Sequence, residues 1–281
     1  MVTAINRENF NGRTVVTCWT CHRGSNRPAA TPALDTVYGT PVIEPADILP
    51  QAPQVPSADE IFTKYIEALG GAARLATVTG YAATGKSRAY GEFGSGYPIE
   101  IFAKAPNQRA TFVHTATGDL ARTFDGRAGF VINPLTVVGQ MALTATELDG
   151  AKLDAELSFP GQIKGTLSNW RVSTPTTLND REVQVVQGSN AAGLVATFYF
   201  DKQTNLLVRM VRYANSVIGR VPTQVDYSDY RDVGGIKMPF HWVFLWLNGQ
   251  DDFVLSEVRL NVPIEAAKFT PQAAPTRTRA R

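Results

Sequence analysis

The fold is indicated by a stretch in the middle of the chain, Arg109-Ala110-Thr111-Phe112-Val113-His114-Thr115, which runs into a Gly118-Asp119 turn. A second short stretch covers residues 120–124 and ends at Asp125-Gly126, and a third covers residues 129–133. Short segments rich in β-branched and aromatic residues, separated by tight turns, are typical of antiparallel strands. This region therefore predicts an antiparallel meander.

The same pattern continues outward in both directions. A period of two begins near Val78, and Asp201-Lys202-Gln203-Thr204-Asn205 and Asn248-Gly249 have the composition of hairpin loops. No internal repeat of fixed period is present. Seven further strands are expected at residues 170–174, 181–187, 195–200, 206–213, 223–230, 239–247 and 253–260.

Two helices interrupt the strands. Ser57 can cap a helix, Glu60 completes a capping box, and the apolar residues that follow lie on one face until Gly70-Gly71 ends the helix. Residues 72–76 can add one more turn, and residues 144–157 have helical spacing and stop before Pro160. These elements together predict a mainly β fold, a large twisted antiparallel sheet with two helices.

Composition divides the chain into four parts. Residues 1–27 form a short polar segment, and residues 28–56 carry seven prolines that favour a semi-rigid extended spacer. Residues 57–271 form the β domain, and residues 272–281 form a basic, disordered tail. The net charge of +2 is spread over interleaved acidic and basic residues, so no nucleic-acid partner is expected.

The first segment contains Cys18-Trp19-Thr20-Cys21-His22. Two cysteines at this spacing can each form a thioether with one haem vinyl group, and the histidine after them can bind the iron, so one covalently attached haem c is expected. A structural zinc site would need two more ligands, but the chain has no other cysteine and its other two histidines lie in separate strands. A thioredoxin-type pair would need a βαβ context that this segment lacks.

Residues 1–25 resemble the last haem segment of photosynthetic reaction-centre cytochrome c subunits, through Met1-Val2-Thr3-Ala4-Ile5-Asn6 and Cys18-Trp19-Thr20-Cys21-His22-Arg23-Gly24. The resemblance implies that His22 and Met1 are the two axial iron ligands, and that the haem transfers electrons to a redox partner. If Met1 is removed by processing, the sixth position is open or differently filled. Alternative sixth ligands are Met141, Met210, Met238, His114 and His241.

Residues 57–271 resemble the LolA-like superfamily of outer-membrane lipoprotein carriers. The matching features are the capped helix, Gly234-Gly235-Ile236-Lys237-Met238-Pro239 and Leu260-Asn261-Val262-Pro263-Ile264. The resemblance implies a curved antiparallel half-barrel whose concave surface holds acyl chains or docks a partner. The fold class expected is therefore mainly β: a short helical c-type haem segment, a proline-rich linker, then this half-barrel with two helices. Ordinary sheet core is the favoured interpretation of the aromatic residues that are candidates for lining it, Phe112, Phe130, Phe198, Phe200, Trp242, Phe244 and Trp246.

Motifs for catalysis are absent: the chain has no nucleophile elbow, no zinc-protease motif and no phosphate-binding loop. The main hypothesis is a monohaem electron-transfer protein, not an enzyme, whose β domain docks to a partner or lipid. One alternative is a lipid or lipoprotein carrier with a vestigial haem segment, and another is self-association in which a neighbouring chain completes the haem pocket. Covalent haem and a carrier-like domain imply the periplasm or outer cell envelope, although residues 1–30 show no export signal and no stretch is long and apolar enough to cross a bilayer.

Overall fold

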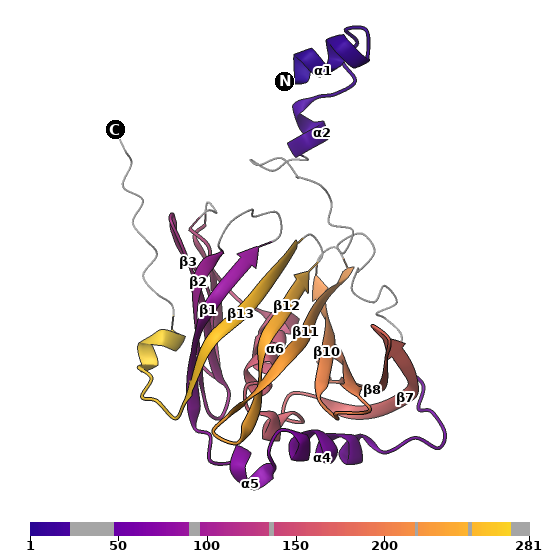
Figure 1. The fold of residues 1–281 in the computed structure, drawn as a ribbon, viewed down its shortest axis with the longest axis vertical. Helices are drawn as coiled ribbons and strands as arrows, with labels where there is room; N and C mark the ends of the chain where they lie inside the picture. The colour runs from indigo at the N-terminus through magenta and orange to yellow at the C-terminus, as the bar shows by residue number, and fades with distance from the viewer. Residues whose placement is uncertain (23–47, 90–95, 135–137, 217–218, 247–248, 271–281) are drawn as a thin grey trace.

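A single curved antiparallel sheet dominates the structure (Figure 1). The structure, a computed structural model, describes residues 1–22, 48–89, 96–134, 138–216, 219–246 and 249–270. The sheet has 13 strands in the order β6-β5-β4-β3-β2-β1-β13-β12-β11-β10-β9-β8-β7. Strands β6 and β7 are its two edges, so the sheet is an unclosed half-barrel, which confirms the predicted mainly β fold class.

Each predicted strand is present, and most are longer than predicted, whereas β2 and β6 lie where no separate strand was predicted. In the first half they are β1 (Gly80–Ala89), β2 (Tyr97–Lys104), β3 (Gln108–Thr115), β4 (Gly118–Phe124), β5 (Gly129–Ile132) and β6 (Gln140–Ala142). In the second half they are β7 (Ser168–Leu178), β8 (Arg181–Ser189), β9 (Val195–Asp201), β10 (Leu207–Ser216), β11 (Gly219–Val233), β12 (Ile236–Trp246) and β13 (Gly249–Leu260).

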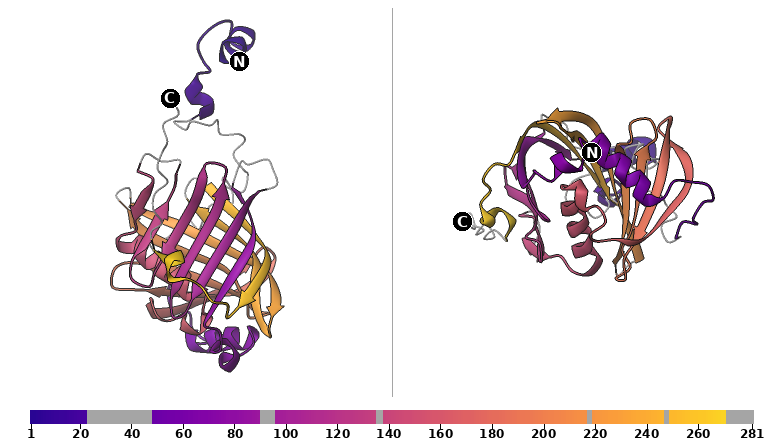
Figure 2. Two further views of the ribbon diagram at one scale, coloured as in Figure 1. Left: turned by 90° about the vertical axis from the view of Figure 1, so that its left-hand side faces the viewer. Right: turned by 90° about the horizontal axis from the view of Figure 1, so that it is seen from below.

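Two meanders are joined at the middle of the sheet, where β1 pairs with β13 from the other end of the domain. The connection between the two edges contains helix α6 (Ala145–Glu156), and Figure 2 shows this helix on the concave side of the sheet. Thr144 and Leu157 are its N-cap and C-cap residues, so the helix predicted at residues 144–157 is confirmed.

Helix α4 (Ala58–Ala68) lies across one end of the half-barrel with the short helix α5 (Ala72–Leu75) (Figure 2). The predicted capping box is formed: the Ser57 hydroxyl accepts from the Glu60 amide, and the Glu60 carboxylate accepts from the Ser57 amide. After the helix, Gly70 has a φ of +126°, and a Cβ there would lie 2.4 Å from the carbonyl oxygen of Gly235. Only glycine therefore lets α4 end this close to the turn between β11 and β12.

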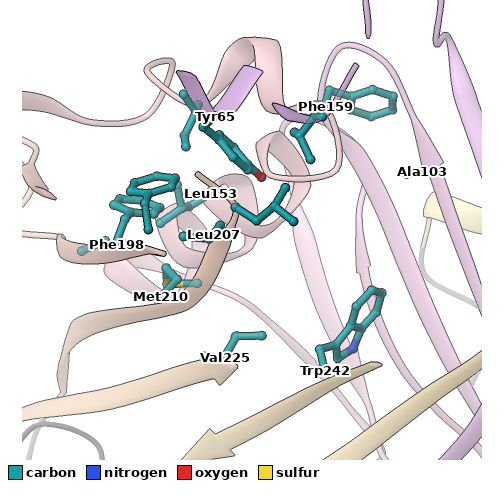
Figure 3. Close-up of a cluster of buried hydrophobic side chains, with 14 of the residues drawn as sticks. Tyr65, Ala103, Leu153, Phe159, Phe198, Leu207, Met210, Val225 and Trp242 are labelled. Carbon is teal, nitrogen blue, oxygen red and sulfur yellow. The ribbon is translucent and has the colours of Figure 1, made fainter. Parts of the chain in front are cut away.

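The main core fills the space between α4, α6 and the concave face. Figure 3 shows Tyr65 of α4 and Leu153 of α6 close to Leu207 of β10, with Trp242 of β12 farther along the sheet. Phe198 and Phe200 of β9 are almost completely buried and form edge or tilted ring contacts with Phe62, Tyr65 and Trp170. The prediction of ordinary sheet core is thus confirmed for these two phenylalanines.

A smaller apolar cluster lies on the other face of β2, β3 and β4. There Phe102 and Phe112 pack beneath Phe269 of the 3-10 helix η2 (Ala266–Phe269), and the Lys268 ammonium lies 4.6 Å from the Phe102 ring centroid. Phe112 therefore does not line the concave surface, because it faces away from it.

The N-terminal segment contains α1 (Val2–Asn9) and α2 (Cys18–His22). The Asn6 side chain joins α1 to the following turn by accepting from the amides of Val15 and Val16 and donating to the Val16 carbonyl. Among the described residues, no helix is long and apolar enough to cross a membrane.

The end of the predicted linker contacts the β domain. The Leu49 amide donates to the Gln187 side chain, and Ala52 donates to the Val172 carbonyl. The rest of the linker, at residues 28–47, and the predicted tail, at residues 272–281, lie outside the described residues. The boundaries of the four predicted parts stay predictions.

Candidate functional site

A cavity of about 1290 Å³ lies on the concave side of the sheet. Its lining comes from α4, α5, the segment after α6 and both halves of the sheet. The volume exceeds the roughly 300–1,000 Å³ that is usual for small-molecule sites. Elements far apart in sequence therefore enclose a space large enough for a bulky or long ligand.

One wall of the cavity is aromatic. Trp242, Phe244 and Trp246 alternate along β12 and all line the cavity, because side chains two residues apart in a strand lie on the same face. Phe253 of β13 pairs with Trp242 in the sheet, and their ring centroids are 6.2 Å apart. The aliphatic side chain of Val225, paired with Phe244, continues this wall into β11.

The wall corrects one part of the sequence interpretation. Of the seven aromatic candidates, Trp242, Phe244 and Trp246 line the cavity, whereas Phe198 and Phe200 belong to the core and Phe112 to the opposite face. Phe130 is half-buried on β5 and does not line the cavity. The alternation along each strand assigned these side chains to one of two faces of the sheet. It did not indicate which face, or which part of it, lines the cavity.

A polar group meets the aromatic wall. The Arg109 guanidinium of β3 donates to the Tyr81 hydroxyl at 3.0 Å and to the Ser158 hydroxyl at 2.6 Å. The same guanidinium lies 5.5 Å from the centroid of the Trp242 ring, close enough for a cation–π interaction. Burial raises the pKa of the neighbouring Tyr227, and the carboxylate of Asp154 raises that pKa further, so this tyrosine is neutral in the cavity.

Two more arginines lie beside α6. The buried Arg212 of β10 donates to the Asp154 carboxylate at 3.1 Å, and Arg122 of β4 has its nearest carboxylate, that of Glu147, at 3.7 Å. Burial lowers the pKa of Arg122, and repulsion from the positive charge of Arg212 lowers it further. Three guanidinium groups thus share two carboxylates, which leaves this part of the site with an excess positive charge.

Several guanidinium nitrogens here have no hydrogen-bond partner within the described part of the chain. These are Nε and Nη2 of Arg122 and Nε and Nη1 of Arg212, and all four are buried. A separate void of about 30 Å³, lined in part by Arg122 and Asp154, is large enough for one water molecule. Sequence reasoning missed this arginine cluster, because its members lie on three strands and each resembles an ordinary surface arginine in the sequence.

The histidines and methionines named as alternative iron ligands have other roles. His114 contacts Asp119 and Glu100, at 2.9 Å and 3.3 Å, and Met210 is buried in the core. His241 contacts the Ser228 hydroxyl at 2.9 Å and the Asp252 carboxylate at 2.6 Å. Met141 is exposed, and Met238 lines the cavity.

Ser228, His241 and Asp252 together resemble a hydrolytic triad only in composition. His241 precedes Trp242 in β12 and therefore faces away from the cavity, and none of the three residues lines either of the two cavities described above. Ser228 pairs with His241 across β11 and β12, so this group is a polar cross-strand contact of the outer face.

Comparisons with known proteins give matches only at the level of structure. No protein-family profile matches the sequence, and no curated protein is significantly similar to it. A LolA superfamily protein from Nitrosomonas europaea superposes with a TM-score of 0.50 at 13% identity, covering 77% of this chain and 99% of that one. The fold is LolA-like.

Two further structures resemble the LolA-like domain. A DUF1329 family protein from Desulfovibrio piger has a TM-score of 0.52 at 10% identity, covering 78% of this chain and all of that one. An outer-membrane lipoprotein-sorting protein domain from Vibrio parahaemolyticus has a TM-score of 0.50 at 10% identity, covering 75% and 94%. At these identities the similarity establishes the fold and not the ligand.

The classification of the chain as an electron-transport cytochrome is wrong. Its described residues are dominated by the LolA-like domain, and within them no group of three or more His, Cys, Asp or Glu side chains could hold a metal ion. Cys18 is an exposed free thiol and Met1 is exposed at the start of α1, while the side chains of Cys21 and His22 lie outside the described residues. The assignment of Cys18, Cys21, His22 and Met1 to a haem stays a prediction.

Proposed function

We propose that the LolA-like domain binds the acyl chains of a lipid or lipoprotein in its cavity and carries them within the cell envelope. The observation that supports this proposal most directly is the aromatic and aliphatic wall of a cavity of about 1290 Å³. The protein acts by binding and not by catalysis. A lipid or lipoprotein carrier was the first alternative that the sequence suggested to an electron-transfer protein.

The chemistry of the wall suits a hydrocarbon ligand. Each CH₂ group moved from water into an apolar site contributes about 0.8 kcal/mol, so a long chain can offset the entropy that binding costs. Trp242, Phe244 and Phe253 supply this surface without a charged group of their own. A chain on this wall would also contact Val225 and Leu255.

The related structures support the same class of ligand. The Vibrio parahaemolyticus domain is named as an outer-membrane lipoprotein-sorting protein domain, and the Nitrosomonas europaea protein is named as a LolA superfamily protein. If this chain also binds lipoproteins, it is expected in the cell envelope. A lipid or lipoprotein is then the expected partner.

Filling the cavity tests the proposal. Val225→Trp places an indole inside the cavity, and Val254→Trp places the same indole on the exposed part of β13 as the matched control. Binding of a fluorescent fatty acid is titrated with both variants and with the unaltered protein. We expect saturable binding that Val225→Trp weakens by about tenfold or more and that Val254→Trp leaves unchanged.

The proposal fails if the unaltered protein shows no saturable binding, or if both tryptophan variants bind as it does. Overpacking costs roughly 1–3 kcal/mol, so thermal unfolding of Val225→Trp is measured first to show that the variant is folded at the assay temperature.

A further inference from the structure

We propose that the cavity selects anionic amphiphiles, whose negatively charged head group is bound by Arg109 and Arg122 while the chain lies along the aromatic wall. This inference rests on the proposed function and names the class of ligand. The head group is a carboxylate or a phosphate, both of which match the planar donors of a guanidinium.

The first argument is position. Arg109 and Arg122 line the same cavity from neighbouring strands. Thr111 of β3 pairs with Arg122 of β4, so their side chains lie on the same face of the sheet. Arg109 lies two residues before Thr111 and therefore on that face too, as the diagonal neighbour of Arg122. The two side chains therefore begin about 7–8 Å apart on one face, within the reach of two long arginine side chains to a common anion.

The second argument is a shortage of neutralising carboxylates: Arg122 has Glu147 at 3.7 Å, and among the described residues no carboxylate forms an ion pair with Arg109. The hydrogen bonds of Arg109 in the described part of the chain go to two neutral hydroxyls, of Tyr81 and Ser158. Asp154, the nearby acid, is used by the buried Arg212. Two buried nitrogens of Arg122 make no hydrogen bond with any described residue, a cost of about 1–3 kcal/mol for each unsatisfied group. If the Arg122 side chain moves when a ligand binds, an anionic head group can accept hydrogen bonds from these nitrogens and offset this cost.

The third argument is that the positively charged Arg109 lies next to the aromatic wall of the cavity. The Arg109 guanidinium lies 5.5 Å from the centroid of the Trp242 ring, and Phe244 and Phe253 line the cavity next to Trp242. A head group at Arg109 thus places the first carbons of its chain on the aromatic surface. A neutral or cationic head group at the same place would leave the positive charge uncompensated.

The test compares four ligands with the same 16-carbon chain, namely palmitate, hexadecyl phosphate, hexadecanol and hexadecylammonium, by their displacement of a bound fluorescent fatty acid at concentrations below those at which each ligand aggregates. We expect palmitate or hexadecyl phosphate to bind at least tenfold more tightly than hexadecanol, and hexadecylammonium to bind least tightly. The tighter of the two anions identifies the head group as carboxylate or phosphate.

Variants locate the effect. Arg109→Gln and Arg122→Gln should each weaken binding of the preferred anion about tenfold and weaken binding of hexadecanol far less, and thermal unfolding shows that both variants are folded at the assay temperature. Arg171→Gln, on the exposed surface of β7, is the matched control and should change neither. Glu147→Gln removes the carboxylate nearest to Arg122 and should strengthen binding of the anion several-fold.

The inference is overturned if hexadecanol binds as tightly as both anions, or if Arg109→Gln and Arg122→Gln lower the affinity for all ligands equally. In either case the lipid-binding function stands. If none of the four ligands binds to the unaltered protein, the proposed function itself fails.

Discussion

Arg212 on β10 and Asp154 on α6 form an ion pair of 3.1 Å in which the arginine side chain is only 1% exposed. The pair connects the second half of the sheet to the helix that crosses its concave side. Arg109 of the first half donates a hydrogen bond to Ser158, the residue after the C-cap of the helix. Helix α6 is thus held from both halves of the sheet by polar contacts, in addition to its apolar packing.

Removal of the Asp154 charge should destabilise the protein strongly. Asp154→Asn leaves Arg212 buried with an uncompensated charge, and breaking a buried ion pair in this way costs about 3–5 kcal/mol. Urea unfolding followed by tryptophan fluorescence measures the loss. Glu182→Gln is the control, because Glu182 pairs with Lys202 on the surface, and such a pair contributes about 0–1 kcal/mol. Equal unfolding free energies for the two variants would contradict this role of Asp154.

At the end of helix α4, a methyl group should destabilise the protein more at Gly70 than at Gly71. Both Gly70 and Gly71 have positive φ, so alanine is strained at either position. At Gly70 the new Cβ would also meet the Gly235 carbonyl at 2.4 Å, whereas at Gly71 nothing lies within 4 Å. Gly70→Ala should therefore lower the unfolding free energy by roughly 1–3 kcal/mol more than Gly71→Ala, since overpacking adds to the backbone strain. A similar loss in both variants would mean that backbone strain alone decides this junction.

The sequence predicted the elements better than their arrangement. Strand positions and the Ser57 capping box follow from local patterns, because side-chain alternation and caps depend on neighbours in the chain. The pairing of β1 with β13 joins residues about as far apart as the domain allows, and no local pattern specifies it.

The site was less predictable still. Trp242, Phe244 and Trp246 could be assigned to one face of a strand, but the cavity exists because α4, α5 and α6 leave that part of the face uncovered. Arg109, Arg122 and Arg212 come together only through the register of β3, β4 and β10 with α6. Such a cluster depends on tertiary structure, so the sequence alone could not show it.

The pH dependence of stability should contain a contribution from Glu156. Burial raises the pKa of this carboxyl in the folded protein, against the opposing effect of its hydrogen bond from the Thr166 amide. A carboxyl with a raised folded pKa binds its proton more tightly in the folded state. Its stabilising contribution is therefore complete below the unfolded pKa of about 4.3 and is lost as the pH rises through the folded pKa.

Glu156→Gln removes this dependence, because the amide can still accept from Thr166 but does not ionise. The unfolding free energy of the variant, relative to the unaltered protein, should rise between acidic pH and neutral pH. Urea denaturation at several pH values measures the difference, with the exposed Glu182→Gln as a control for general charge effects. A difference that stays constant with pH, or that falls toward neutral pH, would contradict the assignment.

Covalent haem attachment is the last prediction, and it can be decided by mass. If Cys18 and Cys21 bind haem c, protein made in a host with a cytochrome c maturation system should exceed its sequence mass by one haem, and the increment should disappear in the double variant Cys18→Ala, Cys21→Ala. The exposed thiol of Cys18 shows that this sulfur is accessible for attachment. Met1→Ala should keep the increment, because thioether bonds do not depend on the axial ligand, and should alter the visible spectrum if Met1 binds the iron. A mass equal to that of the bare chain under these conditions would exclude attachment, without affecting the lipid-binding proposal, since the cavity lies wholly within the LolA-like domain.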